Sequence, residues 1–544
     1  MTGKKRNYPR HSLAALAVLA VLAIVGSAVV LIPAKNLTSA SPASATSTAT
    51  RAVRACQGPI EARQAGEDAG DADFAGGAPA ASASLSVIAL DPRSNALYGG
   101  DQSSQTGMEP GSSDAGGEGA SPRIARTDMG GNATEVDAAT SALLNAVYSH
   151  DSLETSSVLT ASTADESEPV VDASQAHVTG NGDYRGFALS RCAKATSAAS
   201  FAGLTTRAGT SDALVVSNPG SRASRARITA YSENGVEPST QGSDVVVGPG
   251  ETVRVSLATL VDERETVALD VEVNGTALAM SAELVRRDGL VPMGTEITQA
   301  STPDSSLVFP GVVAHEGGSA RLSLARTVRG GASGDPAKVR EEGALATVRA
   351  LDSSGAVIKE WDVQDPGQGA SIDTPLDGLG SGTYTIVVNA RTSVVGSVNS
   401  SIASGSRQGD TVGLPQDFAE YTPVEEINSA SLLSLGKAAE GGSLTIMSEN
   451  GAKLSIAPIR RDGSVGTSTI HELEGGHSLT LTAGDLGEGP TSIVGVVVVS
   501  QDGGSYRGSW SQTVKADDGG TLVAALPLVA DASRASGMTV HVER

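Results

Sequence analysis

Histidine and carboxylate residues are the first candidates for chemistry in this sequence, because they are common metal ligands and acid–base groups. His471-Glu472 is followed by His477 across a turn at Gly475-Gly476, so a hairpin could bring the two imidazoles together. A second pair, His315-Glu316, lies elsewhere in the chain. A zinc site needs a third protein ligand and supporting hydrogen bonds, and the pattern supplies neither. We therefore favour solvated turn histidines over a zinc site.

The remaining candidate sites have simpler structural interpretations. Asp68, Asp71 and Asp73 carry oxygen ligands of the kind that calcium prefers, but their spacing departs from the calcium-loop pattern. A solvated acidic loop is therefore favoured there. The glycine-rich run at 378–382 leads into an expected strand at 384–388. A phosphate-binding loop would lead into a helix amino terminus, so this run predicts a turn.

Signatures of catalysis are absent from the sequence. It contains no Gly-x-Ser-x-Gly nucleophile motif, no His-Glu-x-x-His zinc motif and no phosphate-binding loop with Gly-Lys-Ser/Thr. We therefore expect no catalytic, cofactor-binding or metal-binding residues, and no enzymatic activity. An enzyme would instead require one deep polar pocket, and a pocket that joins His150 or His177 to several carboxylates would favour it.

Composition bounds the classes of fold and partner. The 544-residue chain is too long for one hydrophobic core, so several domains are expected. A formal net charge of −22 repels phosphate backbones and argues against nucleic acid as a partner. Aromatic residues make up only 3% of the chain, and its two tryptophans, Trp361 and Trp510, lie in or beside expected strands. Core packing is favoured for both, with exposed binding anchors as the alternative.

The amino-terminal residues carry the pattern of a membrane anchor. Residues 13–32 are uncharged, and as a helix they would span about 30 Å, the thickness of the bilayer core. Four cations precede this run, so we expect 1–11 in the cytoplasm, 12–33 in the inner membrane and the remainder exported. A cleaved signal peptide, with its site at Ala43-Ser44-Ala45, is the alternative. Residues 34–52 are rich in Ser, Thr and Ala and predict a flexible stalk.

Cys56 and Cys192 are the two cysteines of the chain. Because thiols outside the membrane tend to oxidise, we expect them to form a disulfide, with two unrelated buried thiols as the alternative. Their spacing fits neither a zinc site nor a redox pair.

The region 53–208 is expected to be largely irregular. Strands are expected at 83–90 and 186–190, and apolar residues at helical spacing predict a short helix over 135–148. The Gly- and Ser-rich insertion at 99–122 predicts disorder.

Beyond residue 210, apolar and polar residues alternate, which is the pattern of half-buried strands. Val253, Val255 and Leu257 would face one way, with polar residues between them. The run at 267–273 alternates in the same way and ends at Asn274-Gly275, a strong hairpin signal because both residues tolerate positive φ.

This arrangement occurs three times, with copies about 110 residues apart, the size of one immunoglobulin-like sandwich. In each copy a turn glycine is followed 13 to 15 residues later by a second glycine, and then after ten residues by a leucine. The three sets are Gly235, Gly250 and Leu260; Gly355, Gly369 and Leu379; and Gly463, Gly476 and Leu486. We therefore predict an all-β fold of tandem immunoglobulin-like β-sandwich modules behind one N-terminal transmembrane helix. The sandwiches are expected at 209–300, 301–410 and 428–544, with 411–427 as a linker.

Residues 214–260 resemble an uncharacterised exported actinobacterial family, the domain of unknown function 5719. The resembling segments are Leu214–Gly220, Ile228–Gly235 and Gly248–Val253, and the anchor and cysteine pair are similar to the family's layout. The long insertion at 99–122 departs from that layout. The family has no established activity, so the resemblance transfers no catalytic residue. It implies an envelope location and work beside membrane glycosyltransferases or in cell-wall assembly.

These features together predict a non-enzymatic, membrane-anchored scaffold or interaction protein of the bacterial cell envelope, without a cofactor. Its partners would be cell-envelope proteins or cell-wall glycans. The bulk of the chain would lie outside the cell membrane, which it crosses once with its amino terminus in the cytoplasm. The alternative is a cell-wall hydrolase or transferase on a β scaffold, or an accessory subunit of a membrane glycosyltransferase.

Overall fold

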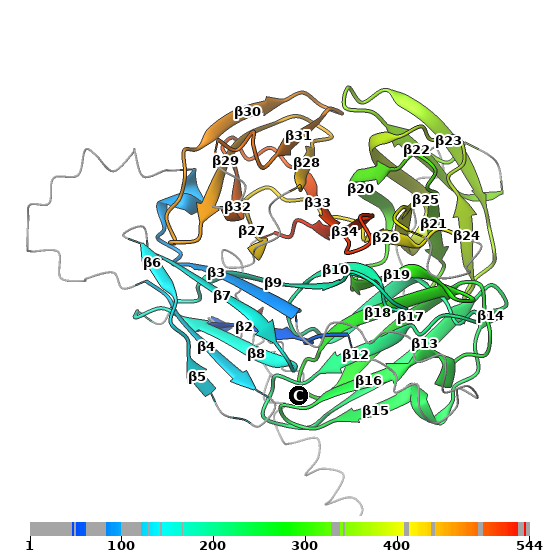
Figure 1. Cartoon of the computed structure of the whole chain (residues 1–544), viewed down its shortest axis with the longest axis horizontal. Coiled ribbons are helices and arrows are strands. Elements are labelled where there is room, and N and C mark those ends of the chain that lie inside the picture. Colours follow the sequence, from blue (N-terminus) through cyan, green and yellow to red (C-terminus); the bar gives the residue numbers. More distant parts are fainter. Residues whose placement is uncertain are drawn as a thin grey trace, which may run out of the picture. The chain divides into compact units, whose positions relative to one another are not determined.

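The computed structural model of the chain describes its strands and most of the connections between them (Figure 1). The described residues are 46–47, 50–60, 83–99, 121–128, 131, 133–141, 144–165, 167–327, 338–340, 343–406, 413–436, 441–487, 493–530 and 538–539. The predicted anchor at 12–33, most of the Gly- and Ser-rich insertion and the acidic cluster at 68–73 lie outside this part of the chain. Within it, no helix has the length and apolarity needed to cross a membrane.

The chain divides into two compact units. In the unit made of Met1–Thr48 and Gly537–Arg544, strand β1 (Thr46–Ser47) pairs with β35 (Met538–Thr539). The unit Ala49–Ser536 holds all the other strands, and their pairings are antiparallel throughout the described residues. The prediction of an all-β fold with several sheets is therefore confirmed. Its eight sheets form four pairs, which we call modules I to IV.

Module I (51–191) lies in the region that the sequence predicted as irregular. One of its sheets has the order β2-β8-β4-β5 and the other β10-β9-β3-β7-β6. A short 3₁₀ helix, η1 (Asn95–Tyr98), follows β3. The strands are β2 (Arg51–Cys56), β3 (Ala83–Leu90), β4 (Arg123–Asp128), β5 (Ala133–Glu135), β6 (Ala139–Ser141), β7 (Asn145–Leu153), β8 (Ser157–Ser162), β9 (Val170–Thr179) and β10 (Gly186–Arg191).

The helix predicted over 135–148 is wrong, because β5, β6 and the start of β7 occupy that segment. Its apolar spacing matched a helix by coincidence. Val147 is buried because β7 pairs with β3, and that pairing imposes the period of a strand.

Module II (198–299) has the sheet orders β11-β17-β13-β14, with β15 also on β13, and β16-β12-β18-β19. The alternation at 252–256 and 267–274 gives strands, as predicted. The elements are β11 (Ala198–Leu204), β12 (Ala213–Ser217), β13 (Ser224–Ser232), β14 (Gly235–Val236), η3 (Gln241–Ser243), β15 (Asp244–Val247), β16 (Thr252–Ser256), η4 (Leu257–Thr259), β17 (Val267–Asn274), β18 (Ala279–Asp288) and β19 (Val291–Gln299).

Module III (304–421) includes one strand, β25, that pairs in both of its sheets. The last strand, β26, occupies residues that the sequence assigned to the linker 411–427, so that assignment is wrong over 416–421. The strands are β20 (Asp304–Ala314), β21 (Ala320–Ala325), β22 (Ala344–Leu351), β23 (Val357–Gln364), β24 (Ser371–Pro375), β25 (Gly382–Ala403) and β26 (Gln416–Tyr421).

Module IV (430–527) has the sheet orders β27-β32-β29-β30 and β31-β28-β33-β34. The strands are β27 (Ala430–Ser434), β28 (Ser443–Met447), β29 (Ala452–Arg460), β30 (Thr469–Leu473), β31 (Ser478–Thr482), β32 (Ile493–Ser500), β33 (Arg507–Lys515) and β34 (Thr521–Pro527).

The four modules share one strand order. Modules I and II have nine strands each, and we count β6 with β7, and β14 with β15, as one strand. With this count, one sheet of each module runs first–sixth–third–fourth and the other runs fifth–second–seventh–eighth, and β25 serves as both sixth and seventh strand of module III. In each module, apolar side chains from both sheets form one buried cluster, so the pairs are β-sandwich-like. The sequence therefore contains four copies of one arrangement rather than the three that we predicted.

The repeated turn glycines confirm the equivalence of the copies. Each has positive φ, between 69° and 107°, which a residue with a side chain adopts only at a cost. The first glycine of each set lies at the turn from the third to the fourth strand, where Gly235 is itself the first residue of β14, and the second lies before the fifth. In module I the same places hold Gly131 at φ 76° and Leu144 at φ 62°. Because a leucine replaces the second glycine there, a search for glycines misses this copy.

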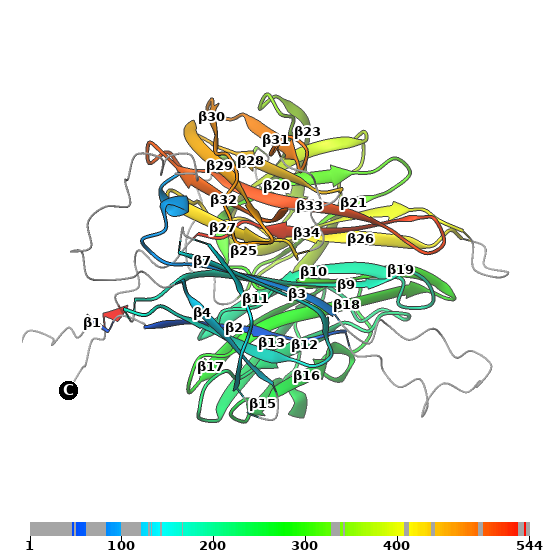
Figure 2. The same cartoon turned by 60° about the vertical axis from the view of Figure 1, so that its left-hand side comes forward.

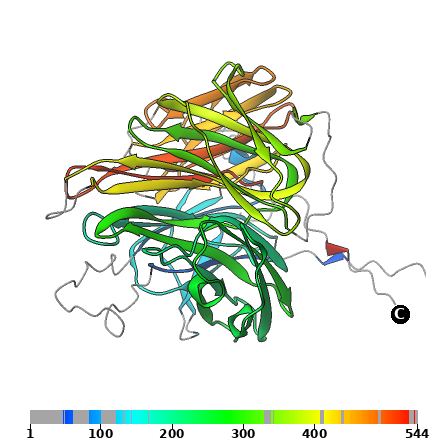
Figure 3. The same ribbon diagram turned by 90° about the vertical axis from the view of Figure 1, so that its right-hand side faces the viewer.

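The eighth strands of the modules hold unit Ala49–Ser536 together. β10 contacts β19, β19 contacts β26, β26 contacts β34, and β34 contacts β10, so the contacts close into a ring around one axis (Figure 1). Figure 2 shows β10 and β19 lying against the layer of β26 and β34, and Figure 3 shows the same layers from the right-hand side. Every module therefore ends at this axis.

Candidate functional site

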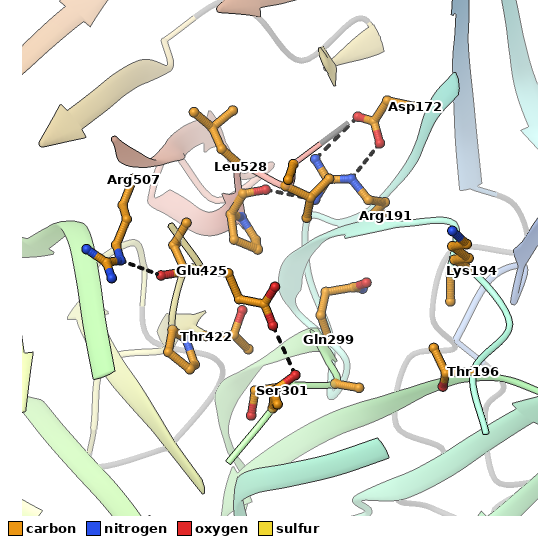
Figure 4. A pocket seen from close by; sticks show the side chains of 18 of the residues that line it. Asp172, Arg191, Lys194, Thr196, Gln299, Ser301, Thr422, Glu425, Arg507 and Leu528 are labelled. Atoms are coloured by element: carbon orange, nitrogen blue, oxygen red, sulfur yellow. Dashed lines mark hydrogen bonds and ion pairs between the residues drawn. The ribbon is translucent and has the colours of Figure 1, made fainter. Parts of the chain in front are cut away.

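A cavity of about 810 Å³ lies where the four eighth strands end (Figure 4). Three segments that connect successive modules, and the one that follows module IV, leave the axis at this end. The cavity is therefore built from all four modules. Its lining includes Arg191 and Lys194 after β10, Gln299 and Ser301 at the end of β19, Thr422 and Glu425 after β26, and Pro527 and Leu528 at the end of β34.

A buried ion pair forms the inner wall of the cavity. The Arg191 guanidinium binds the Asp172 carboxylate, with side-chain exposures of 8% and 3%. Arg191 Nη1 also donates to Pro527 O at 2.7 Å, and Asp172 Oδ2 accepts the backbone N–H of Ser434 at 2.7 Å. These bonds join module I to module IV. Because a buried pair that loses one partner leaves an unpaired charge, both groups serve to hold the wall in place.

Two further arginines of the lining are bound to the backbone. Arg507 Nε donates to Val424 O at 3.0 Å, and its Nη1 lies 2.6 Å from Glu449 Oε1. Arg54 Nη2 donates to Val171 O at 2.9 Å. These side chains fix the connecting segments and keep the cavity open.

Other polar groups of the lining remain available to a ligand. Lys194 is exposed and makes no hydrogen bond or ion pair with the described residues. Glu425 is exposed and accepts one hydrogen bond, from Thr302 Oγ1 at 3.0 Å. Gln299 Nε2 is buried and finds no acceptor in the described part of the chain. An unpaired buried donor is unfavourable, so a ligand acceptor at this position would stabilise the site.

Apart from the Arg191–Asp172 pair and Arg507, which is paired with Glu449, the charges of the lining are separated by module. The cations Arg54 and Lys194 come from module I and the segment after it. The carboxylates Asp304, Glu425 and Glu426 come from the start of module III and from the segment after it. The cavity can therefore favour a ligand that carries both signs of charge.

Buried carboxyls lie between the eighth strands. Asp417 Oδ2 on β26 accepts the N–H groups of Val523 at 2.8 Å and Phe187 at 3.3 Å. Glu296 Oε1 on β19 accepts the N–H of Leu189 at 3.2 Å. These bonds satisfy donors of β10 and β34, the strands at the edges of their sheets. Burial raises the pKa of both carboxyls well above the usual range, and the nearby Asp417 carboxyl raises the pKa of Glu296 further.

Cys56 and Cys192 form a disulfide, as the sequence predicted. It ties the end of β2 to the residue after β10, and Cys192 itself lines the cavity. The bridge therefore fixes the point at which the chain leaves module I for module II.

The histidine pairs of the sequence do not come together as a metal site. His471 lies on β30, with Nε2 2.9 Å from Thr469 Oγ1, and His477 Nδ1 lies 3.3 Å from Gly475 O in the turn that follows. No group of three His, Cys, Asp or Glu side chains in the described residues could hold a metal ion. His315 lies in module III near the end of β20, and burial lowers its pKa.

The other candidates have the structural roles that the sequence favoured. Trp510 is fully buried in the core of module IV, and Trp361 packs against the core of module III. The run 378–382 forms a turn before β25. His150 stacks on Tyr148 in β7, and His177 is buried in β9.

The cavity itself was missed by the sequence analysis. Its residues are far apart in the chain and belong to no motif. The segments that connect the modules could have indicated the cavity. Segments that follow equivalent strands emerge at the same end of a ring, so their residues lie close together. Finding it required the fourth copy, which the sequence did not reveal.

Comparisons with known proteins give a family but no activity. The model of the family of unknown function DUF5719 matches residues 147–484. No curated protein matches the chain. Among solved structures, the chain is similar to the tetra-tandem repeat in the extending region of a large adhesion protein, at 12% identity, over 75% of this chain and 91% of that one, with a TM-score of 0.09. A score of that size supports no inference.

Proposed function

This chain belongs to the family of unknown function DUF5719, and from that premise we propose that it is a non-enzymatic, membrane-anchored interaction protein of the cell envelope. Its modules would be immunoglobulin-like sandwiches held outside the membrane. The observation that carries the proposal is the cavity of about 810 Å³ at the axis, which has exposed charges on connecting segments supported by a rigid ring. Binding groups on loops above a rigid scaffold are typical of recognition proteins.

The disulfide and the sequence of the amino end support an extracytoplasmic location. Disulfides persist in oxidising compartments, and Cys56 and Cys192 are bridged. Residues 13–32 have the length and apolarity of a membrane span, and the cations before them favour a cytoplasmic amino terminus.

The location is tested on intact cells that express the full chain. A membrane-impermeant protease should cleave the chain from outside, and the protein should sediment with membranes. Thiol alkylation before and after reduction should find both cysteines oxidised. Recovery of a soluble, reduced chain from the cytosol would overturn the proposal.

Binding is tested by crosslinking in the same cells. A photoreactive amino acid in place of Thr196, an exposed residue of the cavity lining, should capture an envelope protein or a cell-wall fragment. The same group in place of Glu272, an exposed residue of β17 outside the lining, is the control. Equal labelling at the two positions, or none, would count against a binding role for the cavity.

An enzyme was expected to need one deep polar pocket, and the presence of the cavity makes a cell-wall hydrolase or transferase the second candidate. Neither His150 nor His177 lines the cavity, and Asp172 is bound to Arg191. A hydrolase would have to draw on the exposed carboxylates of the lining, Asp304, Glu425 and Glu426. Release of soluble fragments from purified cell walls, abolished by Glu425→Gln, would favour this candidate over the first.

A further inference from the structure

The chemistry of the central cavity specifies a class of ligand. Its volume of about 810 Å³ lies within the range of small-ligand pockets, about 300–1,000 Å³. No aromatic side chain is part of its lining. Sugar rings commonly pack their C–H faces on aromatic rings, so this lining is poorly suited to a glycan.

The polar groups of the cavity match a peptide better. Lys194 offers an ammonium without a partner in the described residues, and Gln299 Nε2 is a buried donor without an acceptor. Glu425 and Glu426 offer exposed carboxylates. In the view of Figure 4, Gln299 lies between Glu425 and Lys194. An ammonium, an amide carbonyl and a carboxylate of one ligand could meet Glu425, Gln299 and Lys194, in that order.

We propose that the cavity binds a short peptide that carries both a free carboxylate and a free ammonium group. Lys194 binds the carboxylate, Gln299 donates to a backbone carbonyl, and Glu425 with Glu426 binds the ammonium. Outside the Arg191–Asp172 and Arg507–Glu449 pairs, the lining has cations from module I and the segment after it, and carboxylates from the start of module III and the segment after it. This distribution orients the peptide across the axis. This inference rests on the proposal that the protein is a binding protein.

The neighbouring arginines leave this role to Lys194. Arg191 is bound to Asp172 and Pro527 O, and Arg507 is bound to Val424 O and Glu449. Recruiting either of them would break a buried or half-buried contact between modules. Lys194 is recruited without such a loss, because the described structure gives it no contact to break.

The test uses the detergent-solubilised full chain and titration calorimetry with trialanine, N-acetyl-trialanine and trialanine amide. The wild type should bind trialanine most tightly, because only that peptide carries both charges. Lys194→Gln should weaken the binding of trialanine about tenfold, which is the effect of losing one hydrogen bond to a charged group. The same variant should bind trialanine amide as well as the wild type does, because that peptide has no carboxylate to lose.

Glu425→Gln with Glu426→Gln should give the complementary result. The double variant should bind trialanine more weakly than the wild type does and bind N-acetyl-trialanine with unchanged affinity. Lys359→Gln on β23 is the matched control, because Lys359 is exposed and does not line the cavity. Circular dichroism should show that every variant keeps the strand content of the wild type.

Two results would overturn the inference. If trialanine does not bind, or if it binds equally to the wild type and to Lys194→Gln, the roles assigned to these side chains are wrong. If a trimer of N-acetylglucosamine binds more tightly than trialanine, the ligand of the cavity is a glycan and not a peptide. In either case, selective crosslinking from the cavity in cells would still support a binding protein, so the two proposals fail separately.

Discussion

Module I meets module IV on one side and module II on the other, and the two junctions are built differently. At the I–IV junction, apolar side chains from both modules form one buried cluster, which includes Ile88, Leu90 and Val147 of module I and Leu432 and Val497 of module IV. The packing there is close, since a Cβ added at Gly495 would lie 2.2 Å from Ile88 Cδ1. The buried Arg191–Asp172 pair borders the same junction.

The I–II junction is more polar, although β10 and β19 also pack closely there, since a Cβ added at Gly186 would lie 2.3 Å from Thr295 N. Gln57 Nε2 donates to Glu283 Oε1 at 2.7 Å across this junction. The buried apolar residues at the junction form a small cluster around Ile60. A cavity of about 260 Å³ lies between the turns of Gly131 and Gly250.

Equivalent turns touch at another junction. Between modules III and IV, a Cβ added at Gly355 would lie 2.6 Å from the carbonyl oxygen of Gly476. The gap at the I–II junction is therefore a property of that junction and not of the repeated turn.

The difference follows from how the chain connects the modules. Modules I and II are joined directly by the short segment between β10 and β11, whereas modules I and IV are joined only through modules II and III. The short segment keeps folded modules I and II close together. The I–IV contact must bring the two ends of the ring together, so we expect it to depend more on apolar packing.

Removing the disulfide should have the largest effect, because it ties the two ends of module I together beside the segment that leads into module II. Cys56 and Cys192 are 136 residues apart, and a bridge of that span contributes about 4–5 kcal/mol in the chain-entropy model. Cys56→Ser with Cys192→Ser should lower the free energy of unfolding by that amount in urea denaturation. Dithiothreitol should reproduce the loss in the wild type and change nothing in the double variant. An unchanged midpoint would show that the fold does not depend on this bridge.

Breaking the buried ion pair tests the ring-closing side. Asp172→Ala leaves the Arg191 guanidinium buried without its carboxylate and removes the acceptor of Ser434 N–H. The expected loss is about 3–5 kcal/mol in the same assay. Asp244→Ala is the control, because its pair with Arg225 is exposed and should contribute little. If the two variants lower the free energy of unfolding equally, the I–IV junction does not depend on its buried ion pair.

Two truncations compare the junctions directly. Ile88→Ala removes buried methyl groups from the I–IV cluster and should cost about 3 kcal/mol, within the usual range for such a change. Gln57→Ala removes hydrogen bonds at the I–II junction and should cost about 1–2 kcal/mol. Hydrogen exchange should show Ile88→Ala exposing amides of both β3 and β32. A larger effect from Gln57→Ala would reverse the comparison.

Local patterns were sufficient to predict much of the fold. Alternation at 252–257 and 267–273 predicted strands, and positive φ at Gly235, Gly250 and their equivalents shows why glycine recurs there. These features depend on near neighbours in the chain. The resemblance at 214–260 pointed to the family whose model matches 147–484.

The module arrangement depended on distant contacts, which local patterns do not contain. Leu144 occupies a turn position where the other copies have glycine, so module I was not recognised as a copy. The strand at 416–421 was taken for a linker because its role as the eighth strand is set by pairing with β25. The cavity residues could not be predicted for the same reason, since Lys194, Gln299 and Glu425 are brought together only when the ring closes.

The smallest expected effect concerns the axis, where both junctions of module I meet. Asp417 is fully buried, and burial raises its pKa, while the Arg185 guanidinium lowers it in part. Burial also raises the pKa values of Glu296 and Glu420, and it raises the pKa of Asp212 to about 6.

A raised carboxyl pKa means that the folded state binds more protons than the unfolded chain. Each such group therefore costs stability as the pH rises from about 4, the unfolded value, through its folded pKa, by at most about 1.4 kcal/mol per pH unit. Asp417→Asn keeps an acceptor for Phe187 and Val523 N–H but cannot ionise. Its stability near pH 4.5 should change little, and its decline up to pH 8 should be shallower than that of the wild type.

Urea midpoints between pH 4.5 and 8 measure this slope, and the design separates Asp417 from the other buried carboxyls, because they are present in both proteins. Loss of the Asp417 charge should also let Glu296 ionise at a lower pH, since Asp417 raises its pKa. Asp485→Asn is the control: hydrogen bonds from Thr482 hold the pKa of Asp485 below its usual value, so that group titrates below the window. Parallel slopes for the wild type and Asp417→Asn would mean that the axis carboxyls stay protonated throughout, and that pH does not loosen either junction of module I.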